Sequence, residues 1–300
     1  MAYAHAITSA SGGAAAPRVR KIAAADLTDA LRRGWDDFTA MPSHAVFLCL
    51  IYPVVGLVLA QLSFGYRILP LLYPMASGFV LIGPVAAIGL YELSRRRERG
   101  EDAAWTHAFD VFQSPARWSV AMLGLMLVTI FVAWLVAAQA IYWLTFGEAR
   151  PESIAGFLHD VFTTSAGWTM IVAGNVVGFL FAAAVLTVSV VAFPLLLDRH
   201  VGAADAVLTS VRAVSANPVT MALWGLIVAG ALFLGSLPIF LGLTVAVPVL
   251  GHATWHLYRK VVEPEATQQP DRPRPAKGRR SAADFPAALF APTPRDQDRP

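Results

Sequence analysis

Long apolar runs separated by short polar stretches dominate the 300-residue chain. Six segments carry no Asp, Glu, Lys or Arg over most of their length. A helix of roughly 20 apolar residues crosses the hydrocarbon core of a bilayer. The pattern therefore predicts an all-α polytopic membrane bundle with six transmembrane helices, at residues 45–64, 69–92, 118–145, 168–197, 219–236 and 238–258.

Shorter segments alternate apolar and polar positions at helical spacing. Leu27, Leu31, Trp35 and Phe38 form one such stripe, and similar stripes follow around Trp105–Phe112 and Val207–Val214. Helices of this kind lie in the plane of a membrane surface. We expect three amphipathic helices at the inner face. Each precedes a proline and two spans, which predicts a threefold repeat of one helix plus two spans.

The two ends of the chain lack this periodicity. Residues 1–21 are rich in Ala, Ser and Gly, and residues 263–300 are rich in Pro and Arg. Both compositions are typical of disordered segments. We expect a disordered N-terminal tail (1–21), a six-span membrane domain (22–262) and a disordered cytoplasmic tail (263–300).

The basic residues set the orientation of the spans. The two termini and the even-numbered connections hold 21 Lys and Arg, whereas the odd-numbered connections hold 2. Because cytoplasmic segments of membrane proteins are enriched in Lys and Arg, both termini are predicted to be cytoplasmic. A bacterial inner membrane is the expected location. Lipids are the expected partner, including anionic lipids at the inner face, together with a membrane-protein partner or a second copy. No nucleic-acid partner is expected.

Few residues in the chain point to chemistry. His252 and His256 are four residues apart on one predicted helix, a spacing that can bind a metal. Interfacial anchoring in an aromatic belt is favoured over ligation, because no further Cys or His is nearby. Asn175 and Gln139 are the polar residues deepest in the predicted spans, where each is expected to bond a neighbouring helix.

A charge cluster is expected where the fourth span ends. Asp198 and Arg199 follow that span, Arg212 lies on the next helix, and Glu92 ends the second span. We expect Asp198 to be buried against Arg212, beneath the valines of that helix. No catalytic residue, metal site or cofactor is predicted, since phosphate-loop, nucleophile-elbow and paired-Cys motifs are absent from the sequence.

Several short strings resemble a bacterial family of uncharacterised integral membrane proteins, some of whose members are labelled cytochrome c oxidase subunit I. The resemblance covers about residues 25–262 and implies a helical inner-membrane protein. It rests on Gly34-Trp35-Asp36-Asp37-Phe38, Gly83-Pro84, Gly89-Leu90-Tyr91-Glu92, Phe193-Pro194-Leu195-Leu196-Leu197-Asp198-Arg199, Ser210-Val211-Arg212-Ala213-Val214, Asn217-Pro218 and Pro248-Val249-Leu250-Gly251-His252-Ala253-Thr254-Trp255-His256.

The oxidase label does not transfer to this chain. That subunit needs six His ligands within the membrane, and only His252 and His256 lie near a span interior here. The sequence favours a non-enzymatic scaffold that assembles a membrane complex or maintains the envelope. A transporter of an apolar or zwitterionic solute is the alternative, and a redox protein comes third. A cavity lined by Asn175, Gln139 and Glu92 would favour the transporter.

Overall fold

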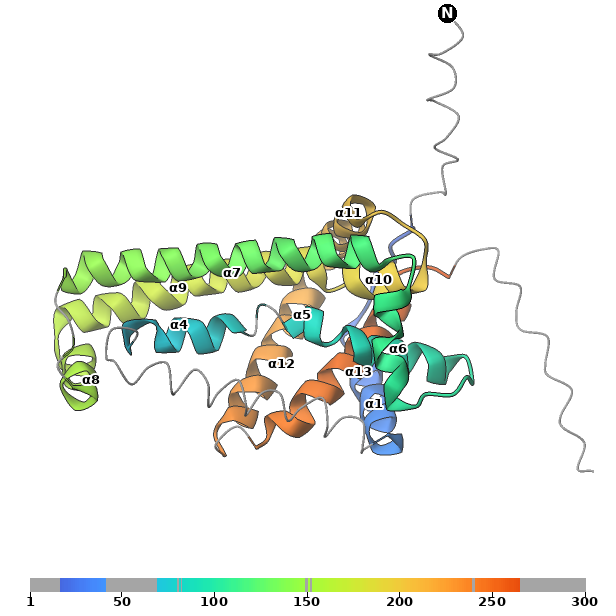
Figure 1. The fold of residues 1–300 in the computed structure, drawn as a ribbon, viewed down its shortest axis with the longest axis horizontal. Helices are drawn as coiled ribbons and strands as arrows, with labels where there is room; N and C mark the ends of the chain where they lie inside the picture. Colours follow the sequence, from blue (N-terminus) through green and yellow to red (C-terminus); the bar gives the residue numbers. More distant parts are fainter. Residues whose placement is uncertain are drawn as a thin grey trace, which may run out of the picture. The chain divides into compact units, whose positions relative to one another are not determined.

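The computed structural model describes residues 17–41, 69–79, 81, 83–148, 151, 153–238 and 241–264. The described residues form helices and no strand beyond one isolated bridge, so the all-α prediction is confirmed for them (Figure 1). The predicted span at 45–64 and both predicted tails lie largely or wholly outside these residues. The elements are α1 (Ala24–Ala40), α4 (Leu69–Phe79), α5 (Gly83–Ala86), α6 (Ile88–Glu98), the 3-10 helix η3 (Trp105–Gln113), α7 (Arg117–Phe146), α8 (Ile154–Thr163), α9 (Ser165–Ser189), α10 (Ala192–Asp198), α11 (Ala203–Ala216), α12 (Pro218–Ser236) and α13 (Leu243–Val261).

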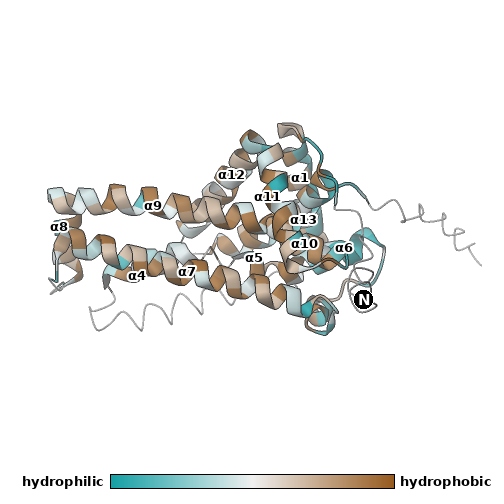
Figure 2. Ribbon diagram, turned by 90° about the horizontal axis from the view of Figure 1, so that it is seen from above, coloured by the Kyte–Doolittle hydropathy of each residue, from teal (hydrophilic) through white to brown (hydrophobic). Residues whose placement is uncertain are grey.

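Three helical segments of the described chain are long and apolar enough to cross a membrane. They are Arg117–Phe146, Ser165–Asp198 and Pro218–Ser236. The segments α7 and α9 run side by side and are apolar along their length (Figure 2). Many of their large apolar side chains are exposed, which in water would leave a large unfavourable surface. Lipid is the environment that suits these faces.

The predicted second span (69–92) is three helices rather than one. Pro84 lies in the four-residue α5, and α6 then continues to Glu98, beyond the predicted end. A proline has no N–H and its ring clashes with the preceding turn, so it interrupts a helix. The basic end of α6 stays helical because Arg95 and Arg96 pair with Glu92 one turn earlier.

The predicted fourth span is also divided. The helix α9 ends at Ser189 and α10 begins at Ala192, with Pro194 in its first turn. Pro194 cannot bond the carbonyl four residues back, which accounts for the break. The Val191 N–H instead donates to the Ser210 hydroxyl of α11 at 3.2 Å. This bond ties α11 to the break and fixes the direction in which α10 carries Asp198.

The amphipathic helix α1 packs along α13 (Figure 1). Its buried face is Leu27, Ala30, Gly34 and Asp37. The protein-facing side shares only Leu27 with the predicted membrane-facing stripe, and Trp35 of that stripe is 50% exposed. The reason is the close approach of α13: a Cβ added at Gly34 would lie 2.7 Å from the Ala253 Cβ, so only a small residue fits at the contact.

The last two helices form the expected hairpin, but with a longer connection than predicted. The helix α12 matches its predicted bounds, whereas α13 starts at Leu243 instead of 238. At the end of α12 the Ser236 hydroxyl donates to the Leu232 carbonyl at 2.7 Å. The hairpin places the C-terminal half of α13 between α1 and α6.

Candidate functional site

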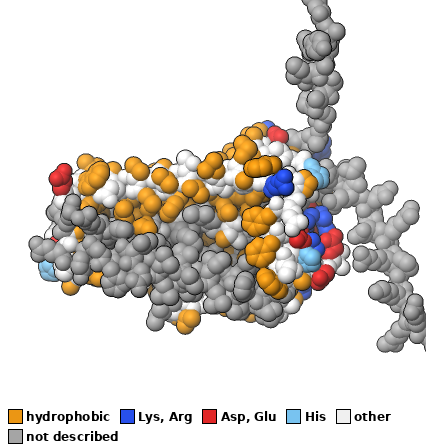
Figure 3. All heavy atoms as spheres, in the orientation of Figure 1, with side chains coloured by type: hydrophobic (Ala, Val, Ile, Leu, Met, Phe, Trp, Pro, Cys, Tyr) orange, Lys and Arg blue, Asp and Glu red, His pale blue; other side chains and the backbone are white. Residues whose placement is uncertain are grey.

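Charged side chains gather where α1, α6, η3, α10 and α13 meet. Figure 3 shows Lys, Arg, Asp and Glu side chains at this end, beside the largely apolar surface of α7. We call this set the charged end. It is held together by ion pairs and hydrogen bonds between helices that are far apart in the sequence.

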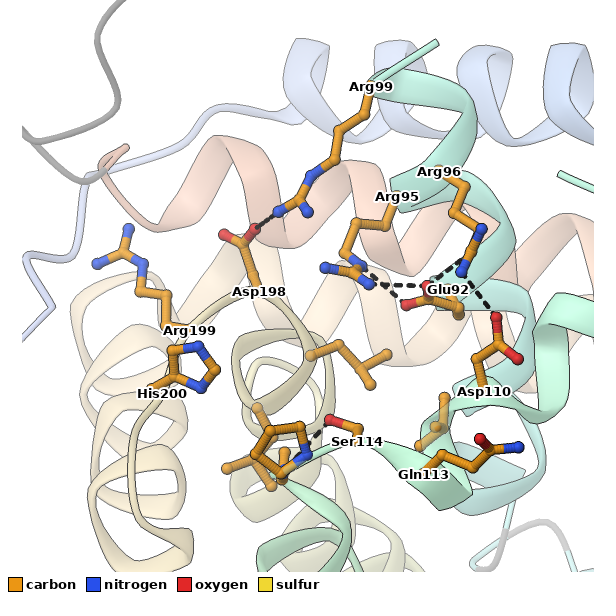
Figure 4. Close-up of a pocket in the computed structure, with 15 residues that line it drawn as sticks. Glu92, Arg95, Arg96, Arg99, Asp110, Gln113, Ser114, Asp198, Arg199 and His200 are labelled. Atoms are coloured by element: carbon orange, nitrogen blue, oxygen red, sulfur yellow. Dashed lines mark hydrogen bonds and ion pairs between the residues drawn. The ribbon is translucent and has the colours of Figure 1, made fainter. Parts of the chain in front are cut away.

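Asp198, the last residue of α10, is a buried carboxylate with several partners. Its side chain is only 3% exposed. It accepts hydrogen bonds from Tyr258 Oη at 2.7 Å and Arg259 Nη1 at 3.2 Å. A longer bond of 3.4 Å comes from Arg99 Nη2 (Figure 4). The predicted pairing with Arg212 is wrong, because Arg212 is exposed on α11.

Arg259 links Asp198 to a second carboxylate. Its Nε donates to Glu98 Oε1 at 3.1 Å. The other oxygen of Glu98 accepts from the Trp255 indole N–H at 2.9 Å. Burial lowers the pKa of Arg259. The charges of Glu98 and Asp198 raise it by more than burial lowers it, so the pKa is above its ordinary value. The guanidinium stays charged and joins α6, α10 and α13.

Glu92 is buried and carries two guanidinium partners. Arg95 binds it through two bonds of 2.8 and 2.7 Å, and Arg96 Nε adds a third at 3.0 Å. Arg96 also reaches Asp110 of η3 at 2.7 Å (Figure 4). Burial lowers the pKa of Arg95, and its bonds to Glu92 more than reverse this effect. A buried carboxylate is tolerated when it is paired in this way.

Asp37 is the buried carboxylate of α1. Its Oδ2 accepts from Ser94 Oγ at 2.6 Å and from His256 Nε2 at 2.8 Å, and Arg97 pairs with Oδ1. Burial raises the pKa of Asp37, but the bonds from His256 and Ser94 lower it below its ordinary value. The carboxylate is thus held in its charged form by partners on α6 and α13.

His252 completes this network. Its Nδ1 lies 2.8 Å from Ser94 Oγ. Since the single hydroxyl proton of Ser94 goes to Asp37, the Nδ1 of His252 is the donor in this contact. The expected belt position does not fit either histidine: His252 is 1% exposed, and His256 is bound to Asp37. No group of His, Cys, Asp or Glu suited to a metal occurs in the part of the chain that the structure describes.

The N-terminal segment 17–23 is fastened to the end of α13. Val19 and Val262 form an antiparallel bridge. The Asn217 side chain accepts from the Ile22 N–H at 2.8 Å and donates to the Arg20 carbonyl at 2.9 Å. The Asn217 amide thus supplies hydrogen-bond partners for two backbone groups of the segment.

A pocket of about 390 Å³ opens between α6, η3, α10 and the start of α7 (Figure 4). Arg199 lines it, but its Nη2 donates to the Glu263 carbonyl, away from the ion pairs of α6. The Nε of Arg199 is buried and has no partner within the described ranges. The lining residues are Glu92, Arg95, Arg96, Arg99, Asp110, Val111, Gln113, Ser114, Pro115, Ala116, Leu196, Leu197, Asp198, Arg199 and His200.

The two polar residues of the predicted spans lie elsewhere. Asn175 is exposed on α9, where it accepts from Tyr73 Oη at 3.1 Å and donates to the Ile171 carbonyl at 2.8 Å. Gln139 is partly buried on α7. Neither lines the pocket, whereas Glu92 does. The structure therefore joins Glu92, Asp198 and Arg199 at one pocket and places His252 and His256 in the adjoining Asp37 network.

The sequence reasoning missed several residues of the charged end. Among them are Asp37, Glu98 and Arg259, and also the arginines of α6 and Asp110 of η3. A signal existed for Asp37, because it follows Leu27, Ala30 and Gly34 at helical spacing on the buried face of α1. The roles of Glu98 and Arg259 depend on contacts over about half the chain and leave no local pattern.

Residues 72–198 match the model of a family described as a predicted integral membrane protein (DUF2189). This range covers α7, α8, α9 and α10 completely, including the two longest apolar segments. No curated protein and no solved structure matches the chain. The family match and the apolar helices together show that the chain is an integral membrane protein.

Proposed function

We propose that the protein is a non-enzymatic scaffold of a bacterial inner membrane. It would cross the bilayer six times with both termini in the cytoplasm, and assemble a membrane complex or maintain the envelope. The observation that carries the proposal is that the buried carboxylates take part in ion pairs that connect helical elements. Asp37 and Asp198 are each bound by side chains of other helices, and Arg96 joins Glu92 of α6 to Asp110 of η3. Ions used in this way fix helices relative to one another.

The apolar helices supply the complementary surface. Val172 and Val176 of α9 and Leu226 of α12 are more than half exposed. Gly178 of α9 packs against Trp134 of α7, whereas a Cβ at Gly174 would meet no atom within 4 Å. A small residue with open space beside it, such as Gly174, lets a helix of another chain approach closely. These faces suit lipids and the helices of a membrane-protein partner or a second copy.

Transport of an apolar or zwitterionic solute is less well supported. Such a carrier was expected to gather Asn175, Gln139 and Glu92 around one cavity. Within the described residues, Asn175 is exposed on α9 and only Glu92 lines the pocket.

Two measurements test the proposal. The full chain, purified in a mild non-ionic detergent, should retain a second copy or a membrane-protein partner in fixed proportion, as judged by light scattering and mass spectrometry. Gly174→Leu should weaken that association and Gly230→Leu, on α12 where a Cβ also meets no atom, should not. A monomer without a partner, stabilised by one class of solute, would support the carrier instead.

The second measurement concerns orientation. In a Cys49→Ala background, cysteines replace Asp102, expected inside, and Glu148, expected outside. A maleimide that cannot cross membranes should label position 148 in intact cells, and position 102 only after the cells are opened. The reverse pattern would overturn the cytoplasmic placement of the charged end.

A further inference from the structure

The pocket beside α6 has the composition of an anion site. Four arginines line it, against three carboxylates. Arg95 and Arg96 are engaged with Glu92 and Asp110. The lining therefore carries an excess of one positive charge even when every carboxylate is ionised. The start of α7 adds the partial positive charge of a helix N-terminus at Ser114, Pro115 and Ala116.

Arg99 is the arginine best able to receive a ligand. Its bond to Asp198 is long, at 3.4 Å, and its side chain is 40% exposed. Asp198 keeps two shorter bonds, from Tyr258 and Arg259, when Arg99 leaves. The Arg99 end of this pair is partly exposed to solvent, which screens the charge, so an incoming anion can compete for Arg99.

Arg199 is a second guanidinium in the lining. Its Nη2 is bound to the Glu263 carbonyl and its Nε is buried, so it contributes positive charge to the pocket without an accessible donor at Nε. The pocket thus combines a movable guanidinium, that of Arg99, with a fixed one.

Aromatic side chains place this pocket at a membrane surface. Trp105, Phe109 and Phe112 are exposed on η3, whose Asp110 and Gln113 line the pocket. Trp118 is 71% exposed at the start of α7, with the Arg117 guanidinium 5.7 Å from its ring centre. Exposed Trp beside Arg is typical of the headgroup layer.

We propose that the pocket binds a phosphate group, carried by a lipid headgroup or by a soluble phosphate compound. Guanidinium forks match phosphate oxygens in pairs, and phosphate offers more acceptors than a carboxylate. The volume of about 390 Å³ admits a group larger than a single ion. The inference rests on the proposed function only for the inner-face location, since the binding itself needs no membrane.

The test uses the full chain in an uncharged maltoside detergent. Dioleoyl phosphatidic acid in mixed micelles is titrated against dioleoylglycerol, which is the same lipid without phosphate. Inorganic phosphate is titrated separately. Phosphatidic acid should bind and dioleoylglycerol should not. Arg99→Gln should weaken binding by about tenfold or more, as expected for loss of a charged hydrogen bond.

Arg32→Gln is the matched control. It removes the same charge from an exposed arginine of α1 that does not line the pocket, and it should leave binding unchanged. If Arg99→Gln lowers the melting temperature, Arg99→Lys replaces it and should bind a few times more weakly than the parent. Binding of phosphatidic acid alone identifies a lipid headgroup, and equal dependence on Arg99 for inorganic phosphate identifies a soluble compound.

Two results would overturn the inference. One is the absence of binding to both phosphate probes, and the other is an equal loss in Arg32→Gln and Arg99→Gln. A protein that binds phosphate but stays monomeric and without a partner would instead contradict only the scaffold proposal. The two proposals therefore fail separately.

Discussion

Gly34 of α1 and Ala253 of α13 meet so closely that a Cβ at position 34 would lie 2.7 Å from the Ala253 Cβ. The same added atom would lie 2.7 Å from the Ala253 amide nitrogen and the Val249 carbonyl oxygen. Backbone atoms cannot move aside as a flexible side chain can. The contact thus fixes the distance between the two helices, and with it the position of Asp37 beside His256.

Gly34→Ala should therefore destabilise the protein. Overpacking of this kind costs about 1–3 kcal/mol. The melting temperature in detergent should fall. Gly230→Ala is the control, because a Cβ there meets no atom within 4 Å and alanine favours a helix. Equal melting temperatures for the parent and Gly34→Ala would show that the helices are not in close contact.

Asp198→Asn should cost roughly 3 kcal/mol. It removes the negative charge shared by Arg99 and Arg259, and breaking one partner of a buried pair is expensive. Arg212→Gln should change the unfolding free energy by less than about 0.5 kcal/mol, because Arg212 is exposed. The comparison is made by thermal unfolding in detergent.

A double-mutant cycle identifies the partner. Asp198→Asn combined with Arg259→Gln should cost less than the sum of the two single changes, because the residues interact directly. Asp198→Asn combined with Arg212→Gln should be additive. Additivity with Arg259 would contradict the ion pair seen between α10 and α13.

Acid should weaken the contact between α1 and α13. The pKa of Asp37 in the folded state is below its ordinary value of 3.8, because the bonds from His256 and Ser94 outweigh the effect of burial. Its contribution is therefore complete above the unfolded pKa, and it is lost as the pH falls through the folded pKa. The melting temperature should fall as the pH decreases below about 4, and this fall should be smaller in Asp37→Asn.

Base should weaken the same helix pair through Lys260. Its amine lies 2.9 Å from Asp29 and 3.2 Å from Asp26. The bond to Asp29 raises its pKa above 10.5, although burial lowers it. The contribution is complete below the unfolded pKa and lost as the pH rises through the folded pKa. Lys260→Gln should remove this alkaline loss of stability, whereas Lys21→Gln, exposed in the N-terminal segment, should retain it.

Asn217→Ala should release the N-terminal segment. It removes the bonds to the Ile22 N–H and the Arg20 carbonyl, each worth about 1 kcal/mol. Trypsin should then cut after Lys21 several times faster. Thr220→Val removes only one bond, of 3.2 Å to the Ile22 carbonyl, and should have a smaller effect. Equal cleavage rates in both variants would count against the role of Asn217.

The local elements of the fold were predictable. The helix α7 was expected at 118–145 and spans Arg117–Phe146, because a long apolar run ends at Pro115 on one side and Gly147 on the other. Within α9 and α10 the sequence pattern indicated one continuous span. The hydrogen bond from Val191 to Ser210, which accommodates the break, is a tertiary contact that hydropathy does not encode.

The partners within the charged end were not predictable. Arg212 is close to Asp198 in sequence, and nearness favoured that pair. The actual partner, Arg259, is brought there by the packing of α13 against α1 and α10. Asp37 illustrates the same limit, since its hydrogen bonds come from Ser94 and His256 on two other helices. Long-range polar contacts follow from the completed fold and not from any window of sequence.

The pairing of α1 with α13 also bears on the order in which parts of the protein pack during synthesis. The helix α1 ends at Ala40, and the helix that covers its buried face begins only at Leu243. More than 200 residues must be synthesised between them. During that time Asp37 has neither His256 nor the surface around Ala253 to pack against. Residues close in sequence can pack early, but this contact closes one of the longest loops in the chain. Native docking of α1 is therefore a late step of biogenesis, completed only when the last helix is in place.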